Sequence, residues 1–565
     1  MKRQLRSREW FFEKEYYAFA RRAYLRSEGF NADIFEDKPV IGIANSWSEL
    51  NHCNRHLREV AEAVKRGVWK AGGVPLEFPT ISLGEPFVKP TSMLLRNLMA
   101  MDVEECIRAY PMDGVVLLCG CDKTTPAQLM GAASADIPAI AVPGGPALSG
   151  VWKDRKLGSG TDGRKLYDLH RMGKITDEEW CEIEGCIARS AGHCMVMGTA
   201  STMTSMAEAL GMTLPGCASI PAPDSRRLAI AERSGRRIVE MVDEDLRPSR
   251  IMTRQAFENA ITVDMALGGS TNAVVHLIAI AGRLGIEVRL EDFDRISRHT
   301  PWIANIKPSG EYLMEDFFYA GGLPAAMREI LPLLHGGCLT VGGRTIAENL
   351  ETAACHQRDV IRTLAAPLYP EGGTAVLDGN LCPRGAVIKP TAASPHLLQH
   401  QGKAYVFERY EQMKEQIERE DLPVDEHSVL VMKNCGPVGG PGFPEWGHIP
   451  MPRVLLQRGV QDVVRISDAR MSGTSFGTVV LHVAPESAVG GPLAIVQTGD
   501  EILLDVPNRR LDLLLTQGEI ERRLAAFVPP TPHYERGYGR LFLEHVTQAD
   551  QGCDFDFLLP ARQPA

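Results

Sequence analysis

Residues 113–135 read DGVVLLCGCDKTTPAQLMGAASA, and this stretch decides the fold class. Its opening part, 113–119, is a short apolar run rich in β-branched side chains, which predicts a buried strand. A polar turn, GCDK, follows, and the remaining residues have the pattern of a helix. A strand, a polar turn and a helix in this order are typical of an α/β domain, in which ligands gather at the carboxyl ends of the strands.

The same alternation continues on both sides of this stretch. Residues 55–71 repeat apolar side chains at helical spacing and stop at Gly72-Gly73, which predicts a helix that ends there. Residues 138–142 predict another buried strand, which runs into a turn rich in proline and glycine. We therefore expect an N-terminal α/β domain with a mostly parallel sheet.

From about residue 375 the sequence changes to short β-type runs separated by glycine and proline. Examples are TAVLDGNLCPRGAVIKP (374–390), HSVLVMKNCGPVGGPG (427–442) and GDEILLDVP (499–507). This pattern predicts a β-rich, barrel-like C-terminal domain. A chain of 565 residues is also too long for one hydrophobic core. We expect domains at 1–365 and 375–565, joined where prolines and glycines cluster.

The composition excludes several classes of partner. The formal net charge is -10 and no run of basic residues opposes it, so nucleic acid is not expected as a partner. No apolar run approaches the roughly 18 residues that cross a bilayer, and the first residues lack the apolar stretch of a signal peptide. We expect a cytoplasmic protein that binds a small-molecule substrate.

Two short motifs do not predict the sites that they imitate. Gly158, Gly160 and Gly163 satisfy G-x-G-x-x-G, but charged residues precede them and no βαβ context with an acidic residue follows, so a dinucleotide site is not expected. His52 and His56 have the spacing of two zinc ligands without the glutamate that a metalloprotease needs. A surface or capping role is expected for these histidines.

Three of the 13 cysteines lie in polar turns rather than in apolar runs. Cys53 lies in ELNHCNRHL, Cys121 in CGCDKTTP and Cys194 in SAGHCMVMGTAST. Buried, unreactive thiols are the ordinary state of cysteines in a chain without a secretory signal. No C-x-x-C knuckle joins the three, so a shared metal site would have to be assembled by the fold.

Six stretches resemble successive signatures of the dehydratase family that contains dihydroxy-acid, phosphogluconate and aldonate dehydratases. They are NHCNRHLREVAEAVKRGVWKAGG, GCDKTTPAQLMGAA, SAGHCMVMGTASTM, ALGGSTNAVVHLIAIA, GEYLMEDFFYAGGLPA and SDARMSGTSFG. Within this family the chain most resembles the sugar-acid branch, typified by L-arabinonate dehydratase. The resemblance implies a homodimer or homotetramer.

The resemblance also implies an iron–sulfur cluster held by Cys53, Cys121 and Cys194. The sugar-acid branch favours a 2Fe–2S cluster, with 4Fe–4S as the alternative. One iron would lack a protein ligand and could act as a Lewis acid on the leaving hydroxyl. Cys119 competes with Cys121 as a ligand, but family members match at the cysteine directly before Asp-Lys, so Cys119 is assigned to the end of the strand.

A second metal, Mg²⁺, is implied with Asp122, Glu445 and a carbamylated Lys123 as ligands. Oxygen ligands of this kind suit a hard cation. Dihydroxy-acid dehydratase has a metal-binding aspartate where this chain has Leu83, and Glu85 supplies the carboxylate instead, as in the aldonate branch. This departure argues against a role in branched-chain amino-acid synthesis.

Ser472 matches the family serine that removes the proton next to the carboxylate. Thr474 and Ser475 lie in the same loop and are expected to matter much less. The expected reaction is dehydration of an aldonic acid such as L-arabinonate to a 2-keto-3-deoxy acid. The alternatives are a dihydroxy-acid dehydratase and a regulatory iron–sulfur sensor, and Ser472 beside a magnesium set argues against the sensor.

Overall fold

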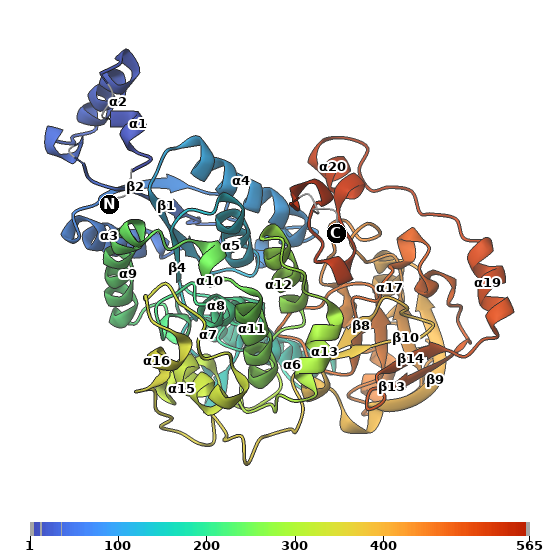
Figure 1. Cartoon of the computed structure of the whole chain (residues 1–565). Helices are drawn as coiled ribbons and strands as arrows, with labels where there is room; N and C mark the ends of the chain where they lie inside the picture. The colour runs from blue at the N-terminus through green and yellow to red at the C-terminus, as the bar shows by residue number, and fades with distance from the viewer. Residues whose placement is uncertain (1–4, 12–13, 36, 561–565) are drawn as a thin grey trace.

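A four-stranded parallel sheet forms the framework of the N-terminal half (Figure 1). Its strands lie in the order β2 (Val74–Pro79), β1 (Val40–Asn45), β3 (Gly114–Cys119) and β4 (Ala139–Pro143), and all neighbours are parallel. The computed structural model describes residues 5–11, 14–35 and 37–560. Strands β1, β3 and β4 are buried along their whole length, which explains why they are almost entirely apolar.

Helices cover both faces of this sheet. On one face α3 (Leu57–Lys70) packs against α9 (Ser225–Glu244), and on the other α4 (Arg96–Ala109) packs against α5 (Thr124–Ala135). The contact between α3 and α9 needs glycine, because a Cβ atom added at Gly67 would lie 2.0 Å from the carbonyl oxygen of Glu232. Further helices, including α8 (Thr199–Ala209), α11 (Arg254–Leu267) and α12 (Asn272–Arg283), extend the core beyond α5.

The C-terminal half is a nearly closed eight-stranded barrel (Figure 1). Its strands are β7 (Ala375–Leu377), β8 (Ala386–Ile388), β9 (Gln399–Phe407), β10 (Val429–Met432), β11 (Arg465–Ser467), β12 (Val479–Leu481), β13 (Glu501–Asp505) and β14 (Arg510–Leu513). They lie in the order β14-β13-β9-β10-β11-β12-β8-β7, and β9 to β12 are parallel to one another. A bridge between Asp378 and Arg510 joins the two edge strands. The predicted fold class, α/β with a barrel-like C-terminal part, is confirmed.

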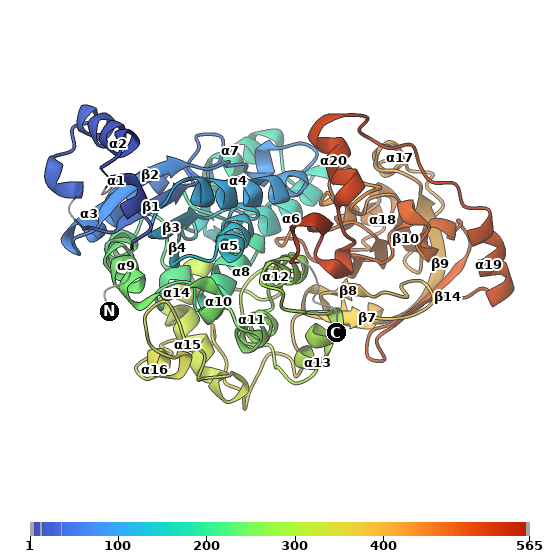
Figure 2. The ribbon, with the colours of Figure 1, turned by 45° about the horizontal axis from the view of Figure 1, so that its top comes forward.

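The glycine motif at 158–163 opens helix α6 (Ser159–Arg171). The strand before it, β6 (Arg155–Leu157), pairs in antiparallel fashion with β5 (Gly150–Trp152), so the local architecture is a hairpin followed by a helix. Figure 2 places α6 near the middle of the molecule, between the parallel sheet and the barrel.

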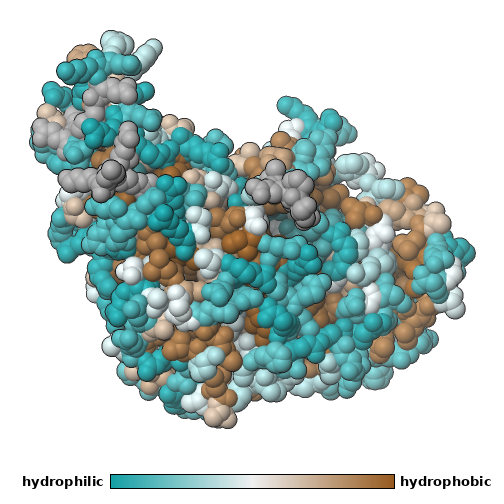
Figure 3. Space-filling view, in the orientation of Figure 1, coloured by the Kyte–Doolittle hydropathy of each residue, from teal (hydrophilic) through white to brown (hydrophobic). Residues whose placement is uncertain are grey.

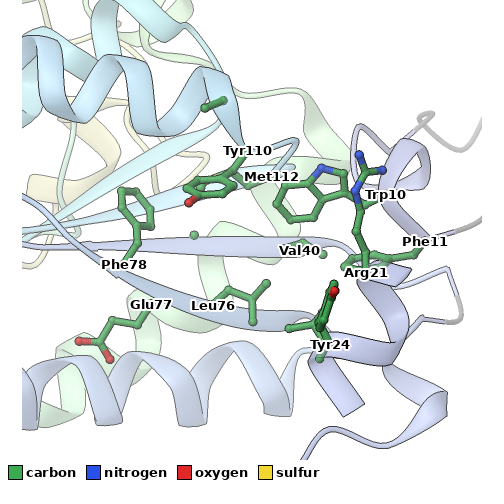
Figure 4. Close-up of a pocket in the computed structure, with 13 residues that line it drawn as sticks. Trp10, Phe11, Arg21, Tyr24, Val40, Leu76, Glu77, Phe78, Tyr110 and Met112 are labelled. Carbon is green, nitrogen blue, oxygen red and sulfur yellow. The ribbon is translucent and has the colours of Figure 1, made fainter. Parts of the chain in front are cut away.

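The N-terminal helices α1 (Arg8–Phe11) and α2 (Tyr16–Ser27) project from the body of the molecule. Hydrophilic residues cover much of the molecular surface that Figure 3 shows. A cavity of about 520 Å³ lies between these helices and the edge of the parallel sheet (Figure 4). Aromatic side chains such as Trp10, Tyr24 and Phe78 line it. No helix within the described ranges is long and apolar enough to cross a membrane.

The last part of the chain leaves the barrel and packs against α4 and α12 of the N-terminal half. Helix α20 (Gly537–His545) lies beside α4 in Figure 2, and Tyr538 donates a hydrogen bond to the Leu94 carbonyl oxygen at 2.8 Å. Arg283 on α12 forms a two-point ion pair with Asp554, with N···O distances of 2.5 and 3.0 Å. These contacts hold the tail, which follows the barrel in sequence, against the N-terminal half. The boundaries at 365 and 375 remain predictions, although β7 begins at residue 375.

Removal of the Asp554 carboxylate tests the role of this tail. Asp554→Ala leaves the buried Arg283 guanidinium with Glu104 as its one charged partner among the described residues, so we expect the free energy of unfolding to fall by about 3 kcal/mol. Urea unfolding followed by tryptophan fluorescence measures the change. The control is Glu544→Gln, which breaks the exposed pair with Arg540 and should cost less than about 1 kcal/mol. Equal losses in both variants would contradict the role given to the tail.

Candidate active site between the two halves

Except for Cys194, the predicted cysteine and metal residues of the N-terminal half lie in segments that follow strands of its sheet. Cys53 lies between β1 and α3, and Cys121, Asp122 and Lys123 form the turn between β3 and α5. Cys194 lies in the loop before α8. Because β1 and β3 are parallel neighbours, the loops that follow them emerge at the same edge of the sheet.

The three predicted cluster ligands are brought together. The pKa of the Cys53 thiol is raised well above its usual value by a hydrogen bond with Cys121, by burial, and by the nearby Cys121 and Cys194. Burial, with Asp122 and Cys121, raises the pKa of Cys194 to about 12. Thiols in such a place release their protons to a strongly bound metal rather than to water. Three neighbouring thiols are donors of the kind that an iron–sulfur cluster takes, although as the side chains stand no three such residues in the described part of the chain are placed to hold a metal ion.

Cys119 lies in a different environment from Cys121. It ends β3 and is fully buried, which raises the pKa of its thiol to about 12. Thr125 and Arg227 lower the pKa of this thiol and Cys217 raises it, and the guanidinium of Arg227 donates to the Cys217 sulfur at 3.3 Å. Cys217, rather than Cys53, Cys121 or Cys194, is thus the thiol that affects the Cys119 pKa.

Three carboxylates from different parts of the chain surround the ammonium group of Lys123. The distances from Lys123 Nζ are 2.9 Å to Glu85, 3.3 Å to Glu445 and 3.5 Å to Asp122. Burial opposes the charge on Lys123, but these carboxylates outweigh it and raise the pKa of the lysine. Burial raises the pKa of Asp122 to about 6, whereas Lys123 and Arg470 outweigh burial at Glu85 and lower its pKa to about 2.

The side chains around Lys123 would suit a hard cation if Lys123 were carbamylated. As the side chains stand, no three histidine, cysteine, aspartate or glutamate residues in the described part of the chain are placed to hold a metal ion. The ammonium of Lys123 occupies the point between the carboxylates instead. A carbamate on Nζ would turn that cation into an anion with two oxygens, so four anionic groups would face one another. Such a set is balanced by an oxygen-liganded divalent cation such as Mg²⁺.

Arg470 connects the carboxylates around Lys123 with residues of both halves. The sequence analysis did not single out this arginine. Its guanidinium is fully buried and donates at 3.1 Å to Glu445, to Asn272 on α12 and to Thr91. Thr91 in turn donates to the Glu85 carboxylate at 2.7 Å. The only sequence signal was the position of Arg470 inside the SDARMSG signature.

Ser472 lies in the loop between β11 and β12, which contacts the N-terminal half. Its Oγ is 3.0 Å from the hydroxyl oxygen of Thr474, and the Thr474 backbone N–H points to it at 3.4 Å. Arg164 on α6 donates to the Thr474 hydroxyl at 2.6 Å. The Ser475 hydroxyl is buried and has no hydrogen-bond partner within the described residues. Of the two neighbouring hydroxyls, Thr474 is therefore the one that contacts Ser472.

Sequence reasoning missed the contribution of α6 to this loop. A Cβ atom at Gly160 would lie 2.3 Å from the Thr474 hydroxyl oxygen, so the close approach of α6 requires glycine there. The motif at 158–163 was considered only as a dinucleotide site. Its glycines instead let Arg164 reach the loop that carries Ser472.

The two histidines beside Cys53 do not have the surface or capping role that was expected. His56 directly precedes α3, but its side chain bonds the carbonyl oxygen of Gly144 at 2.8 Å and makes no capping bond. This bond links the loops that follow β1 and β4. His52 is partly buried, and its Nε2 lies 3.6 Å from the Cys53 sulfur.

Two family models match most of the chain. The dihydroxy-acid/6-phosphogluconate dehydratase N-terminal model matches residues 38–349, and the C-terminal model of the same family matches residues 359–553. These matches define a hydro-lyase. The chain belongs to the dihydroxy-acid/6-phosphogluconate dehydratase family, as its sequence signatures predicted.

The similarity to known relatives extends over nearly the whole chain. L-arabinonate dehydratase of Rhizobium leguminosarum bv. trifolii is 53% identical over 99% of this chain and 97% of its own length. The 6-deoxy-6-sulfo-D-gluconate dehydratase of Pseudomonas putida is 50% identical over 98% of this chain and 96% of its own length. A dihydroxy-acid dehydratase of Ignicoccus hospitalis is 41% identical over 92% of this chain and 95% of its own length. The predicted similarity to sugar-acid dehydratases is confirmed.

The cysteine assignment predicts a clear contrast between neighbouring thiols. Cys53→Ser, Cys121→Ser and Cys194→Ser should each lose the cluster, because serine oxygen is a poor substitute for a thiolate ligand. Cys119→Ser is the matched control and should keep it, since Cys217, rather than any of the three, affects the pKa of Cys119. Iron content and visible absorbance after anaerobic reconstitution measure cluster loading. A colourless Cys119→Ser protein beside a fully loaded Cys121→Ser protein would reverse the assignment.

Proposed function

We propose that this hydro-lyase dehydrates an aldonic acid, such as L-arabinonate, to a 2-keto-3-deoxy acid. One observation carries the proposal. Leu83 stands at the position where dihydroxy-acid dehydratase has its aspartate. Glu85, two residues later, lies 2.9 Å from Lys123 and completes the carboxylate group. The sugar-acid relatives named above, at 50% and 53% identity against 41% for the dihydroxy-acid dehydratase, support the same choice.

The proposed cofactors follow from the donor sets. Cys53, Cys121 and Cys194 would hold the iron–sulfur cluster, 2Fe–2S in this proposal, and the ligands of Mg²⁺ would be Glu85, Asp122, carbamylated Lys123 and Glu445. When bound, the two groups supply Lewis-acid chemistry, which acidifies the C2 proton of the substrate and assists the departure of the 3-hydroxyl.

The proton chemistry belongs to the chain itself. In this proposal Ser472 Oγ, as an alkoxide, takes the proton from C2 of the substrate. The electron pair of the C2–H bond becomes the second bond between C2 and C3 as the hydroxyl leaves C3. The proton on Ser472 Oγ then passes to the departing oxygen, so one water is released and the alkoxide is restored. The enol that remains rearranges to the 2-keto-3-deoxy acid.

The protein is proposed to act in the cytoplasm as a homodimer or homotetramer.

Replacement of Ser472 tests its role as the base. Ser472→Ala should lower kcat by about a thousandfold and leave KM nearly unchanged, because a base acts in the proton-transfer step more than in binding. The matched control is Ser475→Ala, which removes a hydroxyl from the same loop that does not contact Ser472 and should retain activity. Steady-state kinetics with detection of 2-keto acids measure both. Normal exchange of the C2 proton with solvent in Ser472→Ala would assign the base to another group.

The substrate class is tested by competition between acids. L-arabinonate, D-xylonate or D-gluconate should have a kcat/KM at least about 100-fold higher than that of 2,3-dihydroxyisovalerate. Polar groups that bind the extra hydroxyls of a sugar acid are left unpaired when an apolar substrate enters, which costs several kcal/mol. A preference for the branched acid would favour a dihydroxy-acid dehydratase, and a fully loaded protein without any turnover would favour the regulatory sensor.

A further inference from the structure

A chain of hydrogen bonds runs from one half of the molecule to the proposed base in the other. Arg164 on α6 donates from Nη1 to the hydroxyl oxygen of Thr474 at 2.6 Å, across 310 residues of sequence. The Thr474 hydroxyl oxygen lies 3.0 Å from Ser472 Oγ. The same guanidinium nitrogen also donates to the Gly160 carbonyl oxygen at 3.1 Å, which fixes it at the start of its own helix.

The direction of each bond follows from the chemistry of the groups. A guanidinium has only N–H donors, so the Thr474 oxygen is the acceptor in its bond with Arg164. The hydroxyl hydrogen of Thr474 is then free to be donated to Ser472. A serine alkoxide can only accept hydrogen bonds, so the bond must run in this direction when Ser472 acts as a base. The Thr474 backbone N–H, at 3.4 Å, is a second donor toward the same oxygen.

The surroundings hold Thr474 in place for this bond. Its side chain is buried, its carbonyl oxygen accepts a hydrogen bond from the Thr161 hydroxyl at 2.7 Å, and the glycines at 160 and 198 let two helices approach it. A buried donor that is held in position stabilises a developing negative charge without rearrangement in the reaction step. Arg164 also places a positive charge behind that donor.

We infer that Arg164 is a positioning residue, which directs the Thr474 hydroxyl hydrogen to Ser472 and so stabilises the serine alkoxide. The inference deepens the proposed function and rests on the proposed role of Ser472 as the base. It gives Thr474 a larger role than the sequence analysis expected.

The experiment uses the holoenzyme with L-arabinonate and its C2-deuterated form. Arg164→Gln and Thr474→Val should each lower kcat by about 100-fold, with KM within about twofold, since both weaken general-base catalysis. The deuterium isotope effect on kcat should rise in both, because proton removal becomes the slowest step. The double variant should lose little more than either single one, since both remove the same chain of bonds. Thr474→Ser, which keeps the hydroxyl, should restore most of the activity.

Lys165→Gln is the matched control for charge. Lys165 is the next residue on α6, is exposed, and lies 4.9 Å from the ring of Phe476 near the same loop. Its replacement should leave kcat and the isotope effect unchanged. An equal loss in Lys165→Gln would show that the total positive charge of α6 matters rather than the hydrogen bond from Arg164 to Thr474, which overturns the inference. A higher KM with unchanged kcat in Arg164→Gln would also overturn it, because Arg164 would then bind the substrate.

Two comparisons separate failure of the inference from failure of the proposed function. In a Ser472→Ala background, Arg164→Gln should have no further effect, and an additional loss would overturn the inference. An unsubstituted protein that dehydrates no aldonic acid, or a fully active Ser472→Ala variant, would instead overturn the proposed function. Cluster absorbance and the unfolding temperature establish that each variant is folded, and Thr474→Val, which keeps the side-chain shape, supplies the test if Arg164→Gln does not fold.

Discussion

The buried ammonium of Lys123 and the carboxylates around it are the constraint on which the arrangement of the two halves depends. A buried charge without a partner is costly by many kcal/mol, so each of these groups needs the others. Glu85 and Asp122 come from loops of the parallel sheet, whereas Glu445 comes from the barrel half. Lys123 gains its third carboxylate, from Glu445, only when the barrel half packs on the sheet. Assembly of the site and docking of the two halves are therefore one event.

Local signals were enough to predict the elements around the candidate site. The strand and helix predicted from 113–135 correspond to β3 and α5, because a short apolar run and a polar turn depend only on neighbouring residues. The barrel was predicted from the spacing of short β-type runs. That β9 to β12 are parallel could not be predicted, since long connections decide which strands become neighbours. The return of α20 to α4 depends likewise on contacts between distant residues.

The candidate site shows the same division between local and distant information. The polar turns around Cys53, Cys121 and Cys194 were visible in the sequence, and the family resemblance grouped them before the structure brought them together. Arg164 could not be connected with Thr474, because 310 residues separate them and no local pattern links the two. The glycine motif before Arg164 was even misleading, since a tight helix approach and a dinucleotide site require glycines for the same reason.

Ser472 and the carboxylate group around Lys123 both depend on contacts between the two halves. Ser472 comes from the barrel half and its hydrogen-bond chain ends at Arg164 in the N-terminal half, just as Glu445 from the barrel half faces Lys123. Arg470 lies two residues before Ser472 and bonds both Glu445 and Asn272, so the same loop holds the carboxylate group and the serine. A shift of this loop would disturb both at once. Ser472 and the carboxylate group are therefore coupled through the interface, and under the proposed function a change that loosens the interface should impair proton transfer even where it leaves every site residue in place.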